Sequence, residues 1–132
     1  MSKVFLFFLK TKAFLKGGKM IIKKYSDVKA EPVPESGAKK ATLRWVISEK
    51  DGAKNFFMRV FEIEPGGCTP LHQHPWEHEM FVFQGEGSIV REGKEVNVSE
   101  GEVIFIPPDE EHQVKNPFSK TLKLICLIPS RK

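Results

Sequence analysis

The strongest constraint on the fold is a series of short runs rich in β-branched and aromatic residues, which recur after Met20 with turn-forming residues between them. Gly, Pro, Asp and Asn mark the turns, and no long segment repeats its apolar residues with the period of a helix. Many short antiparallel strands in about 110 residues predict an all-β domain, and a jelly-roll barrel fits their number. The expected strands are 42–48, 56–64, 79–84, 88–91, 95–98, 103–106 and 122–128, with a loop over 29–40 before the main sheet.

Side-chain alternation in two of these runs predicts which residues face the barrel interior. In 56–64 the glutamates at positions 62 and 64 must face water, so Arg59 faces inward among aromatic residues. Such an arginine either packs its stem at an edge while its head reaches water, or lines a pocket. In 122–128 Lys123 faces outward, which turns Cys126 inward and predicts a buried thiol in the core.

The charge of the chain is concentrated at its N-terminus. The formal net charge is +4, but residues 1–19 hold five lysines and no acid, so residues 20–132 carry about −1 once those five are subtracted. The main domain is therefore nearly neutral, and a nucleic-acid partner loses its main support. With 132 residues the chain has room for one domain of ordinary size.

The apolar run at residues 4–9 is the only candidate for a targeting segment. Lys10 ends it below the length of a secretory signal or a membrane span, and no small-residue cleavage pattern follows. We expect residues 1–19 to form an extension outside the fold, with Met20 as the natural start and a domain over 20–132. The alternative is a short basic segment that lies on a membrane surface. Two cysteines without a Cys-x-x-Cys pair predict no disulfide framework and a cytoplasmic location.

Three of the four histidines in the chain fall within seven residues. His72 and His74 are two apart, so on a strand both project from one face, and His78 and His112 are available as third and fourth ligands. Neutral imidazole is the commonest protein ligand of divalent transition metals, which predicts one metal site. The alternative is four separate surface or hydrogen-bonded histidines.

The spacing of these histidines resembles the two conserved motifs of the cupin superfamily. The first runs from Gly66 through the histidine group to Gly85, with His78 where many cupins have glutamate. The second runs from Gly101 through Pro107 and His112 to Asn116. The resemblance implies a single cupin jelly-roll barrel, also called a double-stranded β-helix.

Two positions depart from the motifs. Asp109 stands at a glycine position, where aspartate tolerates a left-handed conformation better than most residues. Glu79 also fits the looser form of the first motif and is an alternative third ligand. The count from Gly85 favours His78, and because neighbours on a strand face opposite ways, both cannot easily bind one ion.

Within the superfamily, residues 70–79 most resemble the small single-domain manganese cupins of thermophilic bacteria. That resemblance implies four imidazole ligands and Mn(II) as the foremost ion, with Fe(II), Zn(II), Ni(II) or Cu(II) as alternatives. Four neutral ligands leave two positions of an octahedron open for a small-molecule substrate or O₂. The implied function is dioxygenase-like oxidation of a small organic substrate. The alternatives are a metal-dependent isomerase or epimerase, which needs a nearby base, and a non-catalytic ligand-binding cupin.

Three further residues are candidates for the pocket. Arg59 is available to a carboxylate or enolate, Glu77 to orient a ligand or act as a base, and Cys126 to line the pocket wall. Trp76 and Glu77 are alternatively residues that only shape their loop.

Alternation also predicts an apolar patch on the outer face of the barrel. Phe81 and Phe83 face away from His78, and Met58 and Val60 face outward on another strand. A patch of this kind favours a homodimer, and cover by residues 21–28 is the alternative.

Overall fold

Within residues 19–131, nine strands pair antiparallel in a single sheet. The computed structural model describes residues 19–131. The expectation of an extension at the N-terminus therefore falls, for residues 1–18, outside the described residues. The strands are β1 (Glu31–Pro32), β2 (Lys39–Ile47), β3 (Phe56–Cys68), β4 (His78–Gln84), β5 (Glu86–Arg91), β6 (Lys94–Ser99), β7 (Val103–Ile106), β8 (His112–Lys115) and β9 (Leu122–Pro129), with two one-turn 3₁₀ helices, η1 (Tyr25–Asp27) and η2 (Glu49–Asp51).

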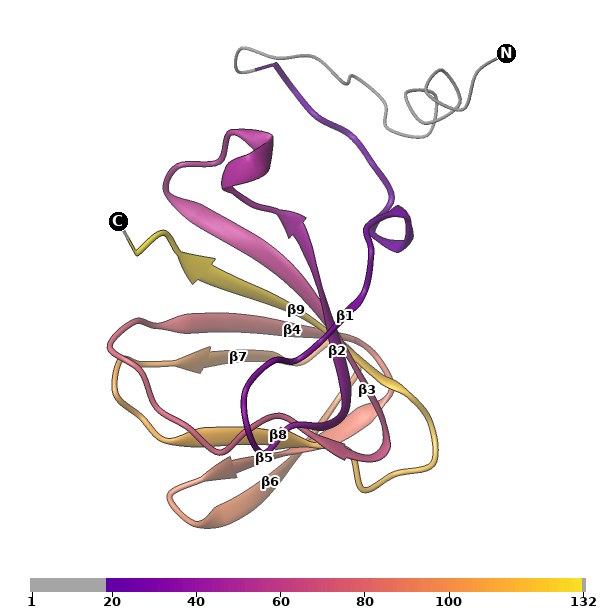
Figure 1. The fold of residues 1–132 in the computed structure, drawn as a ribbon. Helices are drawn as coiled ribbons and strands as arrows, with labels where there is room; N and C mark the ends of the chain where they lie inside the picture. Colours follow the sequence, from indigo (N-terminus) through magenta and orange to yellow (C-terminus); the bar gives the residue numbers. More distant parts are fainter. Residues whose placement is uncertain (1–18, 132) are drawn as a thin grey trace.

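The sheet is strongly curled, as Figure 1 shows. The buried residues inside it form an apolar core. Its strand order is β6-β5-β8-β3-β9-β4-β7, with β2 added to β3 and β1 added to β2. The predicted all-β jelly-roll barrel is confirmed by this arrangement.

The interior is built mainly by the inward faces of β3 and β9, which pair over eight residues from Phe56 opposite Pro129 to Ile63 opposite Leu122. The predicted alternation holds in β9, where Leu122 and Cys126 are both fully buried. Arg59 pairs with Cys126 across the two strands and lines an interior cavity, so it faces inward as expected. A charged side chain is thereby held inside an otherwise apolar barrel.

Strand β3 continues past its expected end at residue 64 because Gly66 and Gly67 form a bulge in it. The register against β2 jumps from Ala41 opposite Ile63 to Lys39 opposite Cys68. Gly66 has a φ of 84°, and a Cβ on Gly67 would lie 2.6 Å from the carbonyl oxygen of Lys39. Only glycine fits so close an approach of two backbones, and the bulge directs the chain toward the histidines.

Two strands were not predicted. The segment expected as a loop over 29–40 contains β1, whose Glu31 pairs with Leu43, and the first residues of β2. Strand β8 is short and mixes polar with apolar residues, so its sequence lacks a strand signal. It is held by pairing with β5, where Arg91 lies opposite His112.

The apolar patch predicted for the outer face of the barrel is only partly observed. Val60 was expected to be exposed, but it is buried, with 3% of its surface exposed. Phe83 is only half-buried and packs edge-to-face against Tyr25, with ring centroids 5.7 Å apart. Arg44 fixes the segment that carries this tyrosine by donating to the carbonyl oxygen of Val28 at 2.6 Å. The chain's own residues 21–28 therefore cover part of this face, which was the alternative explanation.

Among residues 19–131, no helix is long and apolar enough to cross a membrane.

Candidate metal centre

The four histidines lie at one end of the barrel and are positioned by different segments. His72 and His112 form an isolated antiparallel bridge, with backbone N–H to O distances of 3.1 and 2.9 Å. His74 follows on a loop. Its own backbone carbonyl oxygen accepts a hydrogen bond from the backbone N–H of Asp109 at 2.7 Å. His78 opens β4. His72 and His74 thus share one side of an extended segment, although only His72 is paired as a strand residue.

Asp109 holds the turn that brings the second motif to this loop. Its φ is 65°, so the residue adopts the left-handed conformation expected at the glycine position of the motif that the sequence resembles. The departure from the motif therefore leaves the geometry of the turn intact.

Each histidine has a partner at Nδ1. The Nδ1 atoms of His74 and His112 donate to the carbonyl oxygens of Trp76 (3.2 Å) and Glu110 (2.8 Å). Carbonyl oxygens only accept, so in these two neutral imidazoles the hydrogen is on Nδ1 and the lone pair on Nε2. His72 Nδ1 lies 2.8 Å from a carboxylate oxygen of Glu35. The Nδ1 bonds of the site thus prepare the Nε2 atoms as ligands.

The Nε2 atoms of His74, His78 and His112 are buried and have no hydrogen-bond partner among the described residues. A buried polar atom without a partner costs about 1–3 kcal/mol, so three together call for a common ligand. The ligand atoms of His72, His74 and His112 lie within 4.8 Å of one another. At octahedral or tetrahedral angles, nitrogens bound about 2.0–2.2 Å from one ion lie roughly 3–3.5 Å apart, so these three can share a metal if the rings move closer together.

His78 lies beside this group of three without belonging to it. Its ring stacks on that of His74 with a centroid distance of 4.2 Å and an interplanar angle of 17°. His78 is buried, with 5% of its surface exposed, whereas Glu79 is exposed and faces away. The alternation predicted for this pair is thus observed, and His78 as a fourth ligand remains a prediction.

Burial favours the neutral form of His74, His78 and His112 by lowering the pKa of each imidazole. It lowers the pKa of His78 to about 2, and the neighbouring Arg59 guanidinium adds to this effect. Burial is also the main cause that lowers the pKa of His74 and of His112. Metal ligands must be unprotonated, so the site is ready for a cation without having to release protons near neutral pH.

Mild acid is expected to destabilise the metal-free protein. The unfolded chain takes up a proton on His78 below a pKa near 6.5, whereas in the folded protein burial lowers the pKa of His78 to about 2. The free energy of unfolding should therefore fall as the pH drops below about 6.5, with His78 alone contributing up to about 1.4 kcal/mol per pH unit. Urea unfolding between about pH 7 and pH 5 measures this slope. An equal slope in the His78→Gln variant would contradict the assignment.

Two of the predicted pocket residues touch each other and the histidines. Arg59 Nη2 donates to Cys126 Sγ at 3.1 Å, and the same sulfur lies 3.6 Å from His78 Nδ1. Burial raises the pKa of the Cys126 thiol, which therefore stays protonated. The arginine guanidinium packs over Phe61 and Trp45, 4.9 and 5.3 Å from the ring centroids.

Trp76 and Glu77 differ in their relation to the site. The indole of Trp76 stacks on His74 with a centroid distance of 4.5 Å, and the guanidinium of Arg131 lies 4.5 Å over the same indole. Glu77 is exposed and does not line the two cavities beside the histidines. Its role as an orienting group or base remains a prediction to which the structure adds no support.

Glu35 is a residue of the site that the sequence did not reveal. It comes from the segment between β1 and β2 and holds His72 Nδ1, although it lies 37 residues earlier in the chain. The carboxylate is 56% exposed. No motif marks it, since only the folded position of its loop brings it to the histidine.

Replacing Glu35 with glutamine should weaken metal binding without removing it. Loss of a carboxylate that orients a metal-ligating imidazole typically costs about 10- to 100-fold in affinity. Competition titration with a chromophoric chelator measures the change. Glu31→Gln is the matched control, because that exposed side chain has no hydrogen bond to a histidine. Equal affinities of the two variants would show that Glu35 does not act on the ligand.

Two connected cavities lie beside the histidines. The inner one has a volume of about 40 Å³ and is lined by Arg59, His72, His78, His112, Cys126 and apolar residues. The outer one has a volume of about 350 Å³, and its walls include Trp45, Trp76 and Ile128. Arg59, His72 and His78 line both, so a ligand entering through the outer cavity reaches the imidazoles and the arginine together.

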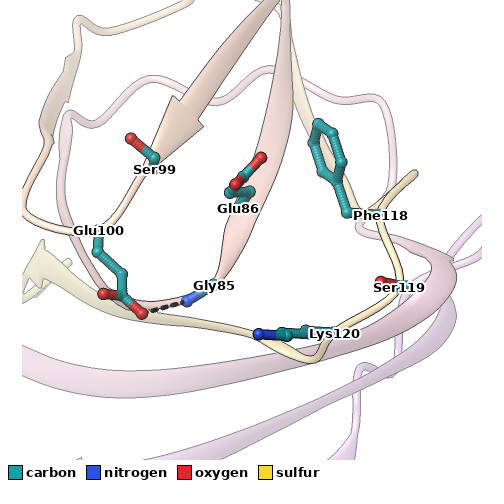
Figure 2. Close-up of a pocket in the computed structure, with 7 residues that line it drawn as sticks. All are labelled: Gly85, Glu86, Ser99, Glu100, Phe118, Ser119 and Lys120. Carbon is teal, nitrogen blue, oxygen red and sulfur yellow. Dashed lines mark hydrogen bonds between the residues drawn. The ribbon is translucent and has the colours of Figure 1, made fainter.

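A separate hollow of about 410 Å³ lies at the far end of β4, shown in Figure 2. Its lining contains no histidine, and Glu100 is engaged there by the backbone N–H of Gly85 at 3.0 Å. Most of its lining side chains are exposed. This hollow is larger than the cavities beside the histidines, but volume alone does not identify a functional site. The buried Nε2 atoms without hydrogen-bond partners place the candidate site at the other end of the barrel.

The cupin domain matches residues 59–128, which is more than half of the chain and includes all four histidines. The chain belongs to the cupin family. Its fold is shared with the polyketide cyclase RemF from Streptomyces resistomycificus, at a TM-score of 0.81 and 40% identity over 84% of this chain and 80% of that one.

Two curated relatives match shorter stretches of this cupin. It is 35% identical over 77 residues to the mannose-1-phosphate guanylyltransferase RfbM from Salmonella typhimurium, covering 57% of this chain and 16% of that protein. It is 31% identical over 68 residues to an oxalate-binding protein from Thermotoga maritima, covering 51% and 56%. Because the chain spans little more than half of such relatives at most, they identify the domain and leave its substrate open.

Proposed function

We propose that this cupin is a metal-dependent oxidoreductase that oxidises a small organic substrate with O₂ in a dioxygenase-like reaction. The observation that carries the proposal is the convergence of unpartnered Nε2 atoms from His74, His78 and His112 beside a ligand-sized cavity. A purely structural metal site has no need of an adjoining cavity.

The residues that would hold the ion are His72, His74 and His112, with His78 as a proposed fourth ligand. Four imidazoles carry no charge, so a bound Mn(II) or Fe(II) ion would supply Lewis-acid and redox chemistry with its full positive charge. Around it, the chain's own side chains exclude water, because the inner cavity is walled by Phe61, Met80 and Leu124.

Oxygen uptake tests the reaction. The Mn(II) and Fe(II) forms are each incubated with a panel of enols, 1,3-diketones and alkenes, and O₂ is followed with an electrode. Consumption by the wild-type protein and its loss in His74→Ala support the proposal. Absence of O₂ uptake with every compound and both metals would refute it, and tight binding without turnover would then indicate a ligand-binding cupin.

A second candidate function is cyclisation of a polyketide-like substrate. The specific reason is the 40% identity and the TM-score of 0.81 to a protein described as a polyketide cyclase. The two candidates differ in one measurable respect. In aldol-type ring closure an α-carbon loses a proton and attacks a carbonyl carbon, water is then lost, and no O₂ is consumed. Conversion of a poly-1,3-diketone under anaerobic conditions would favour the cyclase.

The proposed assembly is a homodimer formed through β4 and β7. Three apolar side chains remain uncovered there, Phe81 at 43%, Val103 at 73% and Phe105 at 58% exposure. Strands β4 and β7 place them on adjacent positions of one face, since Phe81 lies opposite Val103. Sedimentation of the wild-type protein as a dimer and of Phe105→Lys as a monomer supports this interface, whereas a wild-type monomer rules it out.

A further inference from the structure

We propose that the site binds its ligand as an anion, with a small carboxylate group in the inner cavity on Arg59 and an apolar or aromatic body in the outer cavity. This inference deepens the proposed function, since the same cavities hold the substrate there. The charge of Arg59 has no ionic partner among residues 19–131.

Arg59 is an uncompensated cation inside the barrel. None of the ion pairs within residues 19–131 includes it, and its buried Nε has no hydrogen-bond partner there. Its one hydrogen bond among these residues goes to the sulfur of Cys126, which is a weak acceptor. A half-buried cation without a counter-ion is costly, so the guanidinium calls for an anion from outside the chain.

The surroundings of Arg59 fix its position and leave its charge available. The stem belongs to the central strand β3, and the guanidinium is packed against the rings of Trp45 and Phe61. Such contacts hold the group in place without neutralising it. A rigid guanidinium loses little conformational entropy when it binds a planar carboxylate.

The electrostatics of the site strengthen the need for an anion. Glu35, the carboxylate that contacts the histidines, already holds His72 Nδ1 at 2.8 Å and forms no ion pair with Arg59. A divalent ion together with Arg59 would carry +3, against −1 from Glu35. The inner cavity would thus hold an excess of positive charge in apolar surroundings, where charge interactions are strong.

Cavity size and lining select the kind of anion. A volume of about 40 Å³ leaves room for a small planar group next to Arg59, His78 and His112. The outer cavity, at about 350 Å³, shares Arg59, His72 and His78 with the inner one. Its walls also contain the apolar side chains of Leu43, Trp45, Trp76 and Ile128, which can contact an apolar body, beside the charged Glu31, Glu35 and Arg131. The arrangement therefore favours an aryl or alkyl monocarboxylate over acetate, which leaves the outer cavity empty.

Calorimetric titration of the Zn(II)-loaded protein tests this inference, because zinc fills the site without redox chemistry. The probes are benzoate, acetate and the neutral benzamide. We expect benzoate to bind at least about 10-fold more tightly than either of the other two, as charge-assisted hydrogen bonds contribute that much. Equal affinity for benzoate and benzamide, or no benzoate binding, would overturn the proposal.

Variants assign the effect to the arginine. Arg59→Met keeps the packing volume and removes the charge, and should lower benzoate affinity about 10- to 100-fold while leaving benzamide unchanged. Arg59→Lys should fall in between, and it replaces the methionine variant if that one does not fold. Arg91→Met, an exposed position on β5, is the matched control and should bind as the wild type does. Full benzoate affinity in both Arg59 variants contradicts the proposal.

Failure of the carboxylate-binding proposal can be distinguished from failure of the proposed metal-dependent function. Metal content is measured on every sample, and Arg59→Met should retain its ion. If the wild-type protein held no metal, the metal-dependent function would fail. Benzoate titration of that metal-free protein would still decide this inference, through a preference over benzamide that disappears in Arg59→Met.

Discussion

Replacing His74 with alanine is expected to lower the affinity for a divalent metal ion by more than about 100-fold. Changes to groups that merely orient a ligand cost about 10- to 100-fold, and loss of the ligand itself costs more. His74 belongs to the group of three whose ligand atoms lie within 4.8 Å, and its Nε2 is buried without a partner. Metal content after dialysis, measured by mass spectrometry, reports the loss.

Gln73→Ala is the matched control for this variant. Gln73 lies between His72 and His74 in the sequence, is exposed and does not line either cavity beside the histidines. It should retain the metal of the wild-type protein. Equal metal content in His74→Ala and Gln73→Ala, with both variants folded by circular dichroism, would show that the ion does not bind here.

Replacing Asn116 with alanine should lower the free energy of unfolding by about 3 kcal/mol. Asn116 is fully buried, and its side-chain amide donates to the carbonyl oxygens of Ile63 and Lys120, each at 2.8 Å. Its Oδ1 accepts from the backbone N–H of Phe118 at 3.0 Å. The substitution leaves three backbone groups without these partners, and such groups cost about 1–3 kcal/mol each unless water reaches them.

Chemical denaturation of the metal-free proteins measures this effect. Asn97→Ala serves as the control, because Asn97 is an exposed residue of β6 and its loss should change the stability by less than about 0.5 kcal/mol. A stability of Asn116→Ala within that margin of the wild type would mean that the side chain is not the link between β3 and the loop before β9.

Much of the fold followed from side-chain alternation and turn residues. The inward positions of Arg59 and Cys126 were predictable because charged neighbours along the same strands had to face water. The motif spacing indicated His72, His74 and His112, which the structure brings together, and placed Asp109 in a left-handed turn. These features depend on local sequence and strand periodicity, which a single chain reveals.

Other features depend on contacts between distant segments and have no local signal. Glu35 reaches His72 only because the segment between β1 and β2 folds over the barrel end. Val60 was expected to be exposed, but the outer face of its strand is partly covered by residues 21–28. The extension of β3 through Gly66 and Gly67 was interpreted as a turn, since glycine marks turns and bulges alike.

The most direct test of the central claim is the metal content of the full chain purified without an affinity tag. After dialysis against metal-free buffer, the protein is analysed for manganese, iron, zinc, nickel and copper, and then titrated with Mn(II). The histidine arrangement predicts about one transition-metal ion per chain in total, bound or restored by titration. A folded protein that carries none of these ions and binds none on titration would contradict the account.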